Sequence, residues 1–203
     1  MAVDAYMAFI QFTQKPLQAE SQVDLSGNTE VLATTGPMSL VNLAKAGQVF
    51  EIEDYSFDIE QTLNIGSQSM GTGAGKVTFN PFSITRKIDI ASPTFFQMAC
   101  SGTPFQHVIL AMRKSSGGSV AGQFYLRFDF KLVAVKTISF SHDDEAPKET
   151  VTFEYGGLSV RYARQHQDGS MDTPIPGGWT RVKNVVDGMP DSWITPTAWS
   201  ATS

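Results

Sequence analysis

Apolar and polar residues alternate along much of this chain with the two-residue period of β-strands. The alternation is clearest between residues 124 and 140, where an apolar set is interleaved with polar residues that include Arg127, Asp129 and Lys131. One face of this predicted strand is therefore apolar, and the other is expected to contact water.

Residues 4–12 differ, because they are apolar on both faces of the expected strand. Such a strand is either covered on both sides within its own chain or meets another subunit with its second face. The alternate positions Tyr6, Ala8 and Ile10 are the candidate subunit interface.

The phase of the alternation changes at several points, near Glu53–Asp54, at Asn80–Pro81 and across Gly156–Gly157. Bulges and bends of this kind are typical of strongly curved sheets and barrels. The pattern predicts a mainly β fold, an antiparallel β-barrel of two packed sheets that is closed or nearly closed.

One short helix is predicted near residues 92–101, packed on the outside of the barrel. Ser92 is a suitable N-cap and Pro93 a suitable first helical residue, while Phe95 and Met98 share one face. Gly102 fits the position just after a helix end.

The remaining segments have no sustained period. Residues 13–48 read as an elaborated connection, with a helical turn at 38–45. The barrel domain is expected to span 1–166. Residues 167–203 are too short for a second domain and form a C-terminal extension, expected to be anchored by Trp179, Trp193 and Trp199.

A glycine-rich stretch between two strands predicts an exposed loop. It does not match a phosphate-binding pattern, because Lys76 is followed by Val77 and Met70 occupies the place of the first glycine. The loop comprises Gly66, Ser67, Gln68, Ser69, Met70, Gly71, Thr72, Gly73, Ala74 and Gly75.

Composition narrows the classes of partner. A net charge of −5 over 203 residues argues against nucleic acid and anionic membranes, which need basic surfaces. The sequence contains no run of 18 apolar residues, so no membrane span is predicted. The N-terminus has no signal-peptide pattern, and synthesis in the cytoplasm is therefore expected. The single Cys100 is expected to be a buried structural residue.

Catalytic patterns are not found in the sequence. His107, His142 and His166 lie far apart without metal-ligand spacing, and no serine or cysteine nucleophile motif accompanies them. We therefore assign no catalytic, cofactor-binding or metal residue, and we do not expect an enzyme.

The block from Gly71 to Gly118 resembles a known family. It reads G-T-G-A-G-K-V, then F-S-I-T-R-K-I-D-I-A-S-P, then a short helix ending in C-S-G, then V-I-L-A-M-R-K-S-S-G-G. This combination is similar to the Hcp (haemolysin-coregulated protein) family, the tube subunit of the bacterial type VI secretion system.

The resemblance implies a structural subunit that forms hexameric rings, which stack into a hollow tube expelled by sheath contraction. It implies that the glycine-rich loop reaches the adjacent ring and that Arg127, Asp129 and Lys131 face the lumen. The implied partners are further copies of the chain, a VgrG-type spike, the contractile sheath, the baseplate and effector proteins in the lumen. The tube would be cytoplasmic before firing and then secreted.

A second hypothesis stays open from the sequence alone. A monomeric or dimeric β-barrel could bind a small molecule or glycan, with the three tryptophans as stacking platforms. The mass of the particle in solution separates the two hypotheses.

Overall fold

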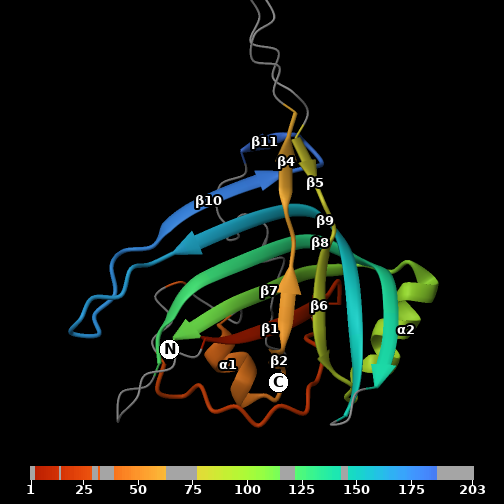
Figure 1. Cartoon of the computed structure of the whole chain (residues 1–203), viewed down its shortest axis with the longest axis horizontal. Coiled ribbons are helices and arrows are strands. Elements are labelled where there is room, and N and C mark those ends of the chain that lie inside the picture. The colour runs from red at the N-terminus through yellow and green to blue at the C-terminus, as the bar shows by residue number, and fades with distance from the viewer. Residues whose placement is uncertain are drawn as a thin grey trace, which may run out of the picture.

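The computed structural model describes residues 3–13, 15–28, 32, 39–62, 77–114, 122–142 and 146–186, and antiparallel strands dominate them (Figure 1). The predicted mainly β fold is confirmed. The elements in chain order are β1 (Val3–Gln11), α1 (Leu40–Lys45), β2 (Phe50–Ile52), β3 (Asp54–Ser56), β4 (Ile59–Gln61), β5 (Val77–Phe79), β6 (Phe82–Lys87), α2 (Ser92–Ser101), β7 (Phe105–Lys114), β8 (Phe124–His142), β9 (Pro147–Tyr162), β10 (Ile175–Thr180) and β11 (Val185–Val186).

The large sheet has the order β11-β10-β9-β8-β7-β1-β2, and β6 pairs with both β9 and β3. Within the described ranges, the hydrogen-bonded sheet does not close on itself. Glu53 alone separates β2 from β3, however, and its N–H donates to the carbonyl oxygen of Thr85 at 3.0 Å. The chain therefore links the β1 side of the sheet to the β6 side, which gives a nearly closed barrel.

Phenylalanine rings fill the interior of this barrel. Phe82 stacks on Phe130 and on Phe153, with ring centroids 4.3 and 4.8 Å apart. All three side chains are completely buried, and Phe9 and Phe95 pack edge to face beside them. Burial of such rings is the main favourable contribution to folding.

The predicted phase changes mark places where strands exchange partners. Before Asn80 the chain is β5 and pairs with β4, whereas after Pro81 it is β6 and pairs with β9. Strand β9 pairs with β6 as far as Phe153 and with β10 from Gly157 onward. A break in the apolar–polar alternation of the sequence therefore marks a position where a strand changes its pairing partner.

One expected position in β8 is wrong. The alternation placed Leu132 on the apolar face, but its φ is 52° and its side chain is 42% exposed, while Val133 and Val135 turn inward. The pairing register is continuous here, with Lys131 opposite Gly157 and Val133 opposite Tyr155, so the left-handed backbone at Leu132 reverses the faces without an inserted residue. The sequence alternation contains no sign of this reversal in β8.

Both helices lie where they were expected. Gly102 ends α2 in the left-handed region at φ 69°, and its N–H donates to the Met98 carbonyl oxygen. Two details are corrected: Ala91, instead of Ser92, is the N-cap, and Cys100 is exposed because it lies off the buried face of Phe95 and Met98.

Sequence reasoning missed the strands β10 and β11. Strand β10 pairs antiparallel with β9, from Ile175 opposite Tyr162 to Thr180 opposite Gly157. Its sequence IPGGWT has no alternation to reveal a strand, and β11 has only two residues. Trp179 packs against the barrel core, so the first part of the expected extension belongs to the sheet.

Candidate functional site

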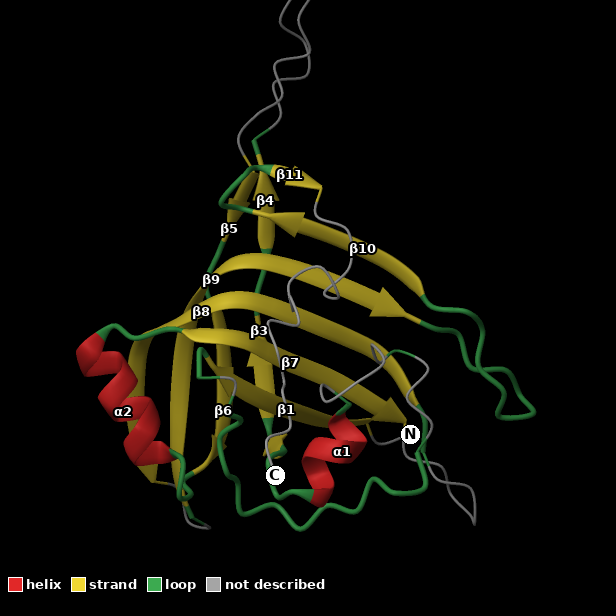
Figure 2. Cartoon of the chain, turned by 180° about the vertical axis from the view of Figure 1, so that it is seen from behind, coloured by secondary structure: helices red, strands yellow, loops and turns green. Residues whose placement is uncertain are grey.

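The second apolar face of β1 is covered within the chain. Tyr6, Ala8 and Ile10 are buried against Leu40 and Leu43 of α1, which lies over this face of the sheet (Figure 2). A role for the three β1 residues in subunit contacts stays a prediction. Any such contact would have to be made through the connection that covers them.

A buried ionic cluster occupies the neighbouring part of the same face, on β7 and β8. Asp129 is 0% exposed and Arg127 is 1% exposed. The Arg127 guanidinium donates to both carboxylate oxygens of Asp129, at 2.8 to 3.1 Å, and His107 Nε2 lies 2.9 Å from Asp129 Oδ1. Because an ionised carboxylate only accepts, the Nε2–H of His107 is the donor in this hydrogen bond.

This geometry explains the acidity of Asp129. Burial by itself raises the pKa of a carboxyl, but the Arg127 guanidinium and the hydrogen bond from His107 outweigh it. Together they hold the pKa of Asp129 well below its usual range. The carboxylate is therefore ionised across the physiological range although it has no contact with solvent.

The cluster changes the interpretation of the β8 polar face. Arg127 and Asp129 were expected to contact water, and this is wrong for the single chain, since both are buried; Lys131 is half-buried. Nearby, Arg161 Nη1 donates to the carbonyl oxygen of Leu32 at 2.9 Å and so holds the 13–48 connection over this face. Whether this face lies toward a lumen stays a prediction.

A second buried ion pair lies at the opposite face of the sheet, inside the barrel end. Arg86 Nε donates to Glu149 Oε1 at 2.8 Å, and Arg86 Nη2 donates to Asp89 Oδ1 at 2.8 Å. The guanidinium also lies 4.9 Å from the ring centres of Phe50 and Phe95. The sequence did contain a signal for it, because Arg86 and Glu149 both occupy apolar positions of their strands.

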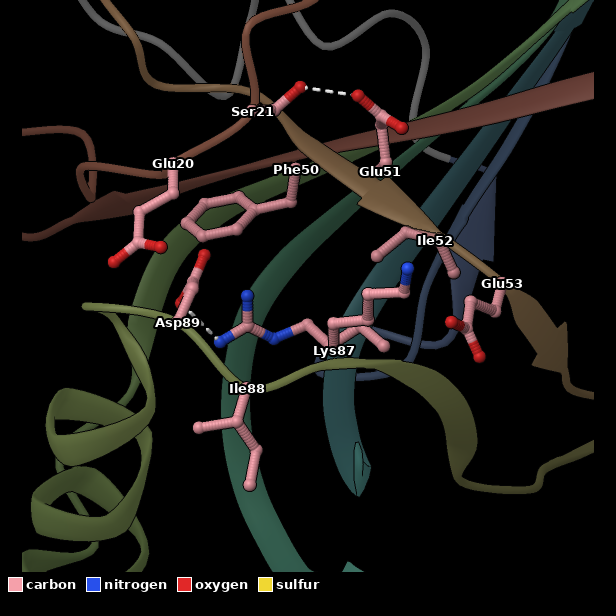
Figure 3. Close-up of a pocket in the computed structure, with 10 residues that line it drawn as sticks. Glu20, Ser21, Phe50, Glu51, Ile52, Glu53, Lys87, Ile88 and Asp89 are labelled. Carbon is pink, nitrogen blue, oxygen red and sulfur yellow. Dashed lines mark hydrogen bonds and ion pairs between the residues drawn. The ribbon is translucent and has the colours of Figure 1, made fainter. Parts of the chain in front are cut away.

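A pocket of about 440 Å³, which Arg86 helps to line, opens between β2 and the end of β6 (Figure 3). Glu20, Glu51, Glu53 and Asp89 border it, and each has a partner in the chain. Ile90 N–H donates to Glu20, Ser21 to Glu51, Lys148 to Glu53 and Arg86 to Asp89. These carboxylates therefore link the chain segments around the barrel end.

Two groups of exposed apolar side chains lie at opposite ends of the sheet. We define the α2 surface as Ile88, Ile90, Phe96 and Phe140, and the β10–β11 surface as Ile175, Val185 and Val186. In both views α2 and the β10–β11 hairpin are far apart (Figures 1 and 2). Phe96 is 52% exposed and Ile175 is 72% exposed, and exposed apolar side chains that are grouped in this way mark candidate interaction surfaces.

Other expected features lie outside the described residues. They are the whole loop from Gly66 to Gly75, together with Trp193 and Trp199. Within the described ranges, no three His, Cys, Asp or Glu side chains gather as metal ligands, and no helix has the length and apolarity to cross a bilayer.

Comparison with known proteins gives a family. Residues 42–162, more than half of the chain, match the family model described as "Type VI secretion system effector, Hcp". A solved type six secretion system protein covers 92% of this chain and 100% of its own, with a TM-score of 0.70 and 21% identity. Hcp1 from Salmonella typhimurium gives the same coverages, a TM-score of 0.59 and 22% identity. A type VI secretion system effector from Yersinia pestis covers 87% of this chain and 99% of its own, with a TM-score of 0.59 and 15% identity. Among curated proteins no sequence match is found.

The fold and its surfaces define an antiparallel β-barrel protein with apolar surfaces at its two ends. The match over residues 42–162 is decisive for the family: the chain belongs to the Hcp family and is a type VI secretion tube subunit. The solved structures agree in fold. The alternative hypothesis, a binding module for a small molecule or glycan, is not favoured.

Proposed function

We propose that six copies of this chain form a ring, that rings stack into a hollow tube, and that sheath contraction expels the tube with effector proteins in its lumen. The single observation that carries the proposal is the pair of exposed apolar surfaces at opposite ends of the sheet. Two unlike surfaces favour head-to-tail contacts, which close into a ring when the rotation between copies divides a full turn.

The subunit supplies geometry and repeated contacts in this proposal, and it performs no catalysis. The buried charged side chains form ion pairs, Arg86 with Glu149 and Arg127 with Asp129, as expected for a rigid structural unit. A VgrG-type spike, the sheath and the baseplate are the proposed partners. The tube would lie in the cytoplasm before firing and be secreted afterwards.

Between stacked rings, the glycine-rich loop of residues 66–75 is proposed to contact the adjacent ring. It connects β4 and β5, which form a separate two-stranded sheet projecting beyond the barrel (Figure 1). Lys131, the least buried of the three polar β8 residues, is the best candidate for a side chain toward the lumen.

Negative-stain microscopy of the purified chain tests the proposal. We expect annular particles with a central hole, and short stacks of them at high protein concentration. Uniform compact particles without a hole, at concentrations where the chain is folded and soluble, would contradict it.

A further inference from the structure

A groove lies where β5 leaves the barrel. On the edge of β9 that lies away from β8, β6 is the partner up to Phe153 and β10 is the partner from Gly157. Between these points this edge has no strand partner among the described residues, and it faces β5 and the turn after β10. The groove has a volume of about 700 Å³ and is lined by Val77, Phe79, Tyr155, Arg181, Val182 and Asn184. This volume lies in the range of roughly 300–1,000 Å³ that is typical of ligand sites.

The groove combines an aromatic wall with a cation. The Arg181 guanidinium lies 5.8 Å from the ring centre of Phe79 and 5.7 Å from that of Tyr155. It donates to the Tyr155 carbonyl oxygen at 2.8 Å and to Glu154 at 3.2 Å, which fixes its position. A planar aromatic side chain and a nearby carboxylate are the groups that such a site recognises.

The rim of the groove is apolar and open to solvent. Val182 lines the groove and is 73% exposed, and the exposed Val185 and Val186 follow it in the chain. An exposed apolar side chain beside an aromatic wall indicates a surface that is covered by another segment.

The segment that follows β11 has the matching chemistry. Residues 187–203 contain two tryptophans, two aspartates and no lysine or arginine, whereas the turn before β11 carries Arg181 and Lys183. Val185 pairs with Thr180, so the segment begins next to the groove. Gly188 and Pro190 are turn-forming residues that allow the chain to reverse. Trp193 then lies within a reach of roughly 23 Å of Val186.

We propose that the C-terminal segment 187–203 docks into this groove of its own chain, with Trp193 as the anchor against Phe79, Tyr155 and Val182. Asp191 then lies near the cations of the 181–184 turn. The docked segment covers the gap between β5 and the β10–β11 hairpin, at the end of the molecule where β4 and β5 form their separate two-stranded sheet. The proposal does not depend on ring formation.

Tryptophan fluorescence of single-tryptophan variants of the full chain tests this docking. Trp179 and Trp199 are replaced by Phe so that Trp193 alone reports. Trp179 Nε1 is buried without a hydrogen-bond partner among the described residues, so its replacement by Phe leaves no acceptor without its donor. We expect a blue-shifted emission and an acrylamide quenching constant several-fold below that of a free peptide of residues 187–203. The matched variant that keeps only Trp199 should be quenched more strongly.

Two substitutions decide where the segment docks. Val182→Asp places a charge in the groove and should return Trp193 to the quenching constant of the free peptide. Ile175→Asp changes an equally exposed residue outside the groove and should leave Trp193 protected. Quenching of Trp193 like the free peptide in the unmodified groove would overturn the proposal, and so would protection that survives Val182→Asp. Loss of protection in Ile175→Asp, or on dilution, would place the segment in another copy and overturn docking within the chain.

Discussion

Asp129 shows how this barrel tolerates charge in a position that its strand pattern assigned to water. The carboxylate has no exposure, and its stability as an ion rests on Arg127 and His107. Removing one partner of a buried ion pair leaves the other charge uncompensated, which is more costly than the pair was favourable.

Asp129→Asn is therefore expected to destabilise the fold by about 3–5 kcal/mol, because Arg127 stays buried without its counter-ion. Urea denaturation followed by circular dichroism measures the change. Asp172→Asn is the matched control: this carboxylate also pairs with an arginine and a histidine, but in an exposed hairpin, and its loss should leave the midpoint unchanged. Equal effects of the two substitutions would contradict the role of burial.

The stability difference between the unmodified chain and Asp129→Asn should also depend on pH. The pKa of Asp129 is lowered in the folded state, so its contribution is fully present above the unfolded value of about 4 and is lost as the pH falls below it. The difference in unfolding free energy between the unmodified chain and Asp129→Asn should shrink by roughly 1 kcal/mol per pH unit below about pH 4. A difference that stays constant from pH 7 to pH 3 would show that Asp129 is not ionised in the fold.

The strands and helices were largely predictable because their signals are local. Gly102 ends α2 where a left-handed residue was expected, and Asn80–Pro81 separates β5 from β6 where the phase of the alternation changes. Other features depend on distant partners. Leu132 turns outward because of its irregular backbone, and IPGGWT becomes β10 only because β9 offers an unpaired edge.

The candidate site was less predictable for the same reason. The residues of the buried Arg127–Asp129 cluster were singled out, but their burial depends on the 13–48 connection, whose packing no sequence period reports. Phe96 could have been recognised as exposed, since it lies off the helix face of Phe95 and Met98. Ile175 could not, because its strand was not recognised.

Strand β8 and strand β9 fit together at a glycine. A Cβ at Gly156 would lie 3.2 Å from Leu132 Cβ, whereas a Cβ at Gly177 on β10 would lie at an ordinary 3.7 Å from Val160. Gly156→Ala is expected to lower the unfolding free energy by about 1–3 kcal/mol through overpacking, while Gly177→Ala should have little effect. Thermal unfolding of both variants checks this, and an equal response would remove the special role of the Leu132 irregularity.

Substitutions in the loop between β4 and β5 should affect contacts between rings. Gly73→Val with Gly75→Val should weaken the stacking of rings and leave the rings themselves intact, because valine restricts a backbone that glycine leaves free. Sedimentation at high protein concentration measures stacking. Loss of rings in a folded double variant would contradict the assignment of this loop to contacts between rings.

For the whole molecule, the difference between the α2 surface and the β10–β11 surface predicts what happens when two variants are mixed. Phe96→Asp disables the α2 surface and Ile175→Asp disables the β10–β11 surface, so neither variant alone should form rings. Mixed together, they retain one working contact and should form heterodimers, because head-to-tail contacts join unlike surfaces. Dimers of either variant alone would indicate that a surface binds its own copy, and the two-surface account would be wrong.

The central claim, that the chain is a subunit of a ring, is tested most directly by native mass spectrometry of the unmodified chain. Six copies of a 22.1 kDa chain give a particle of about 133 kDa, which is the mass we expect. A folded particle that stays at the mass of one or two chains over the micromolar range would contradict the account.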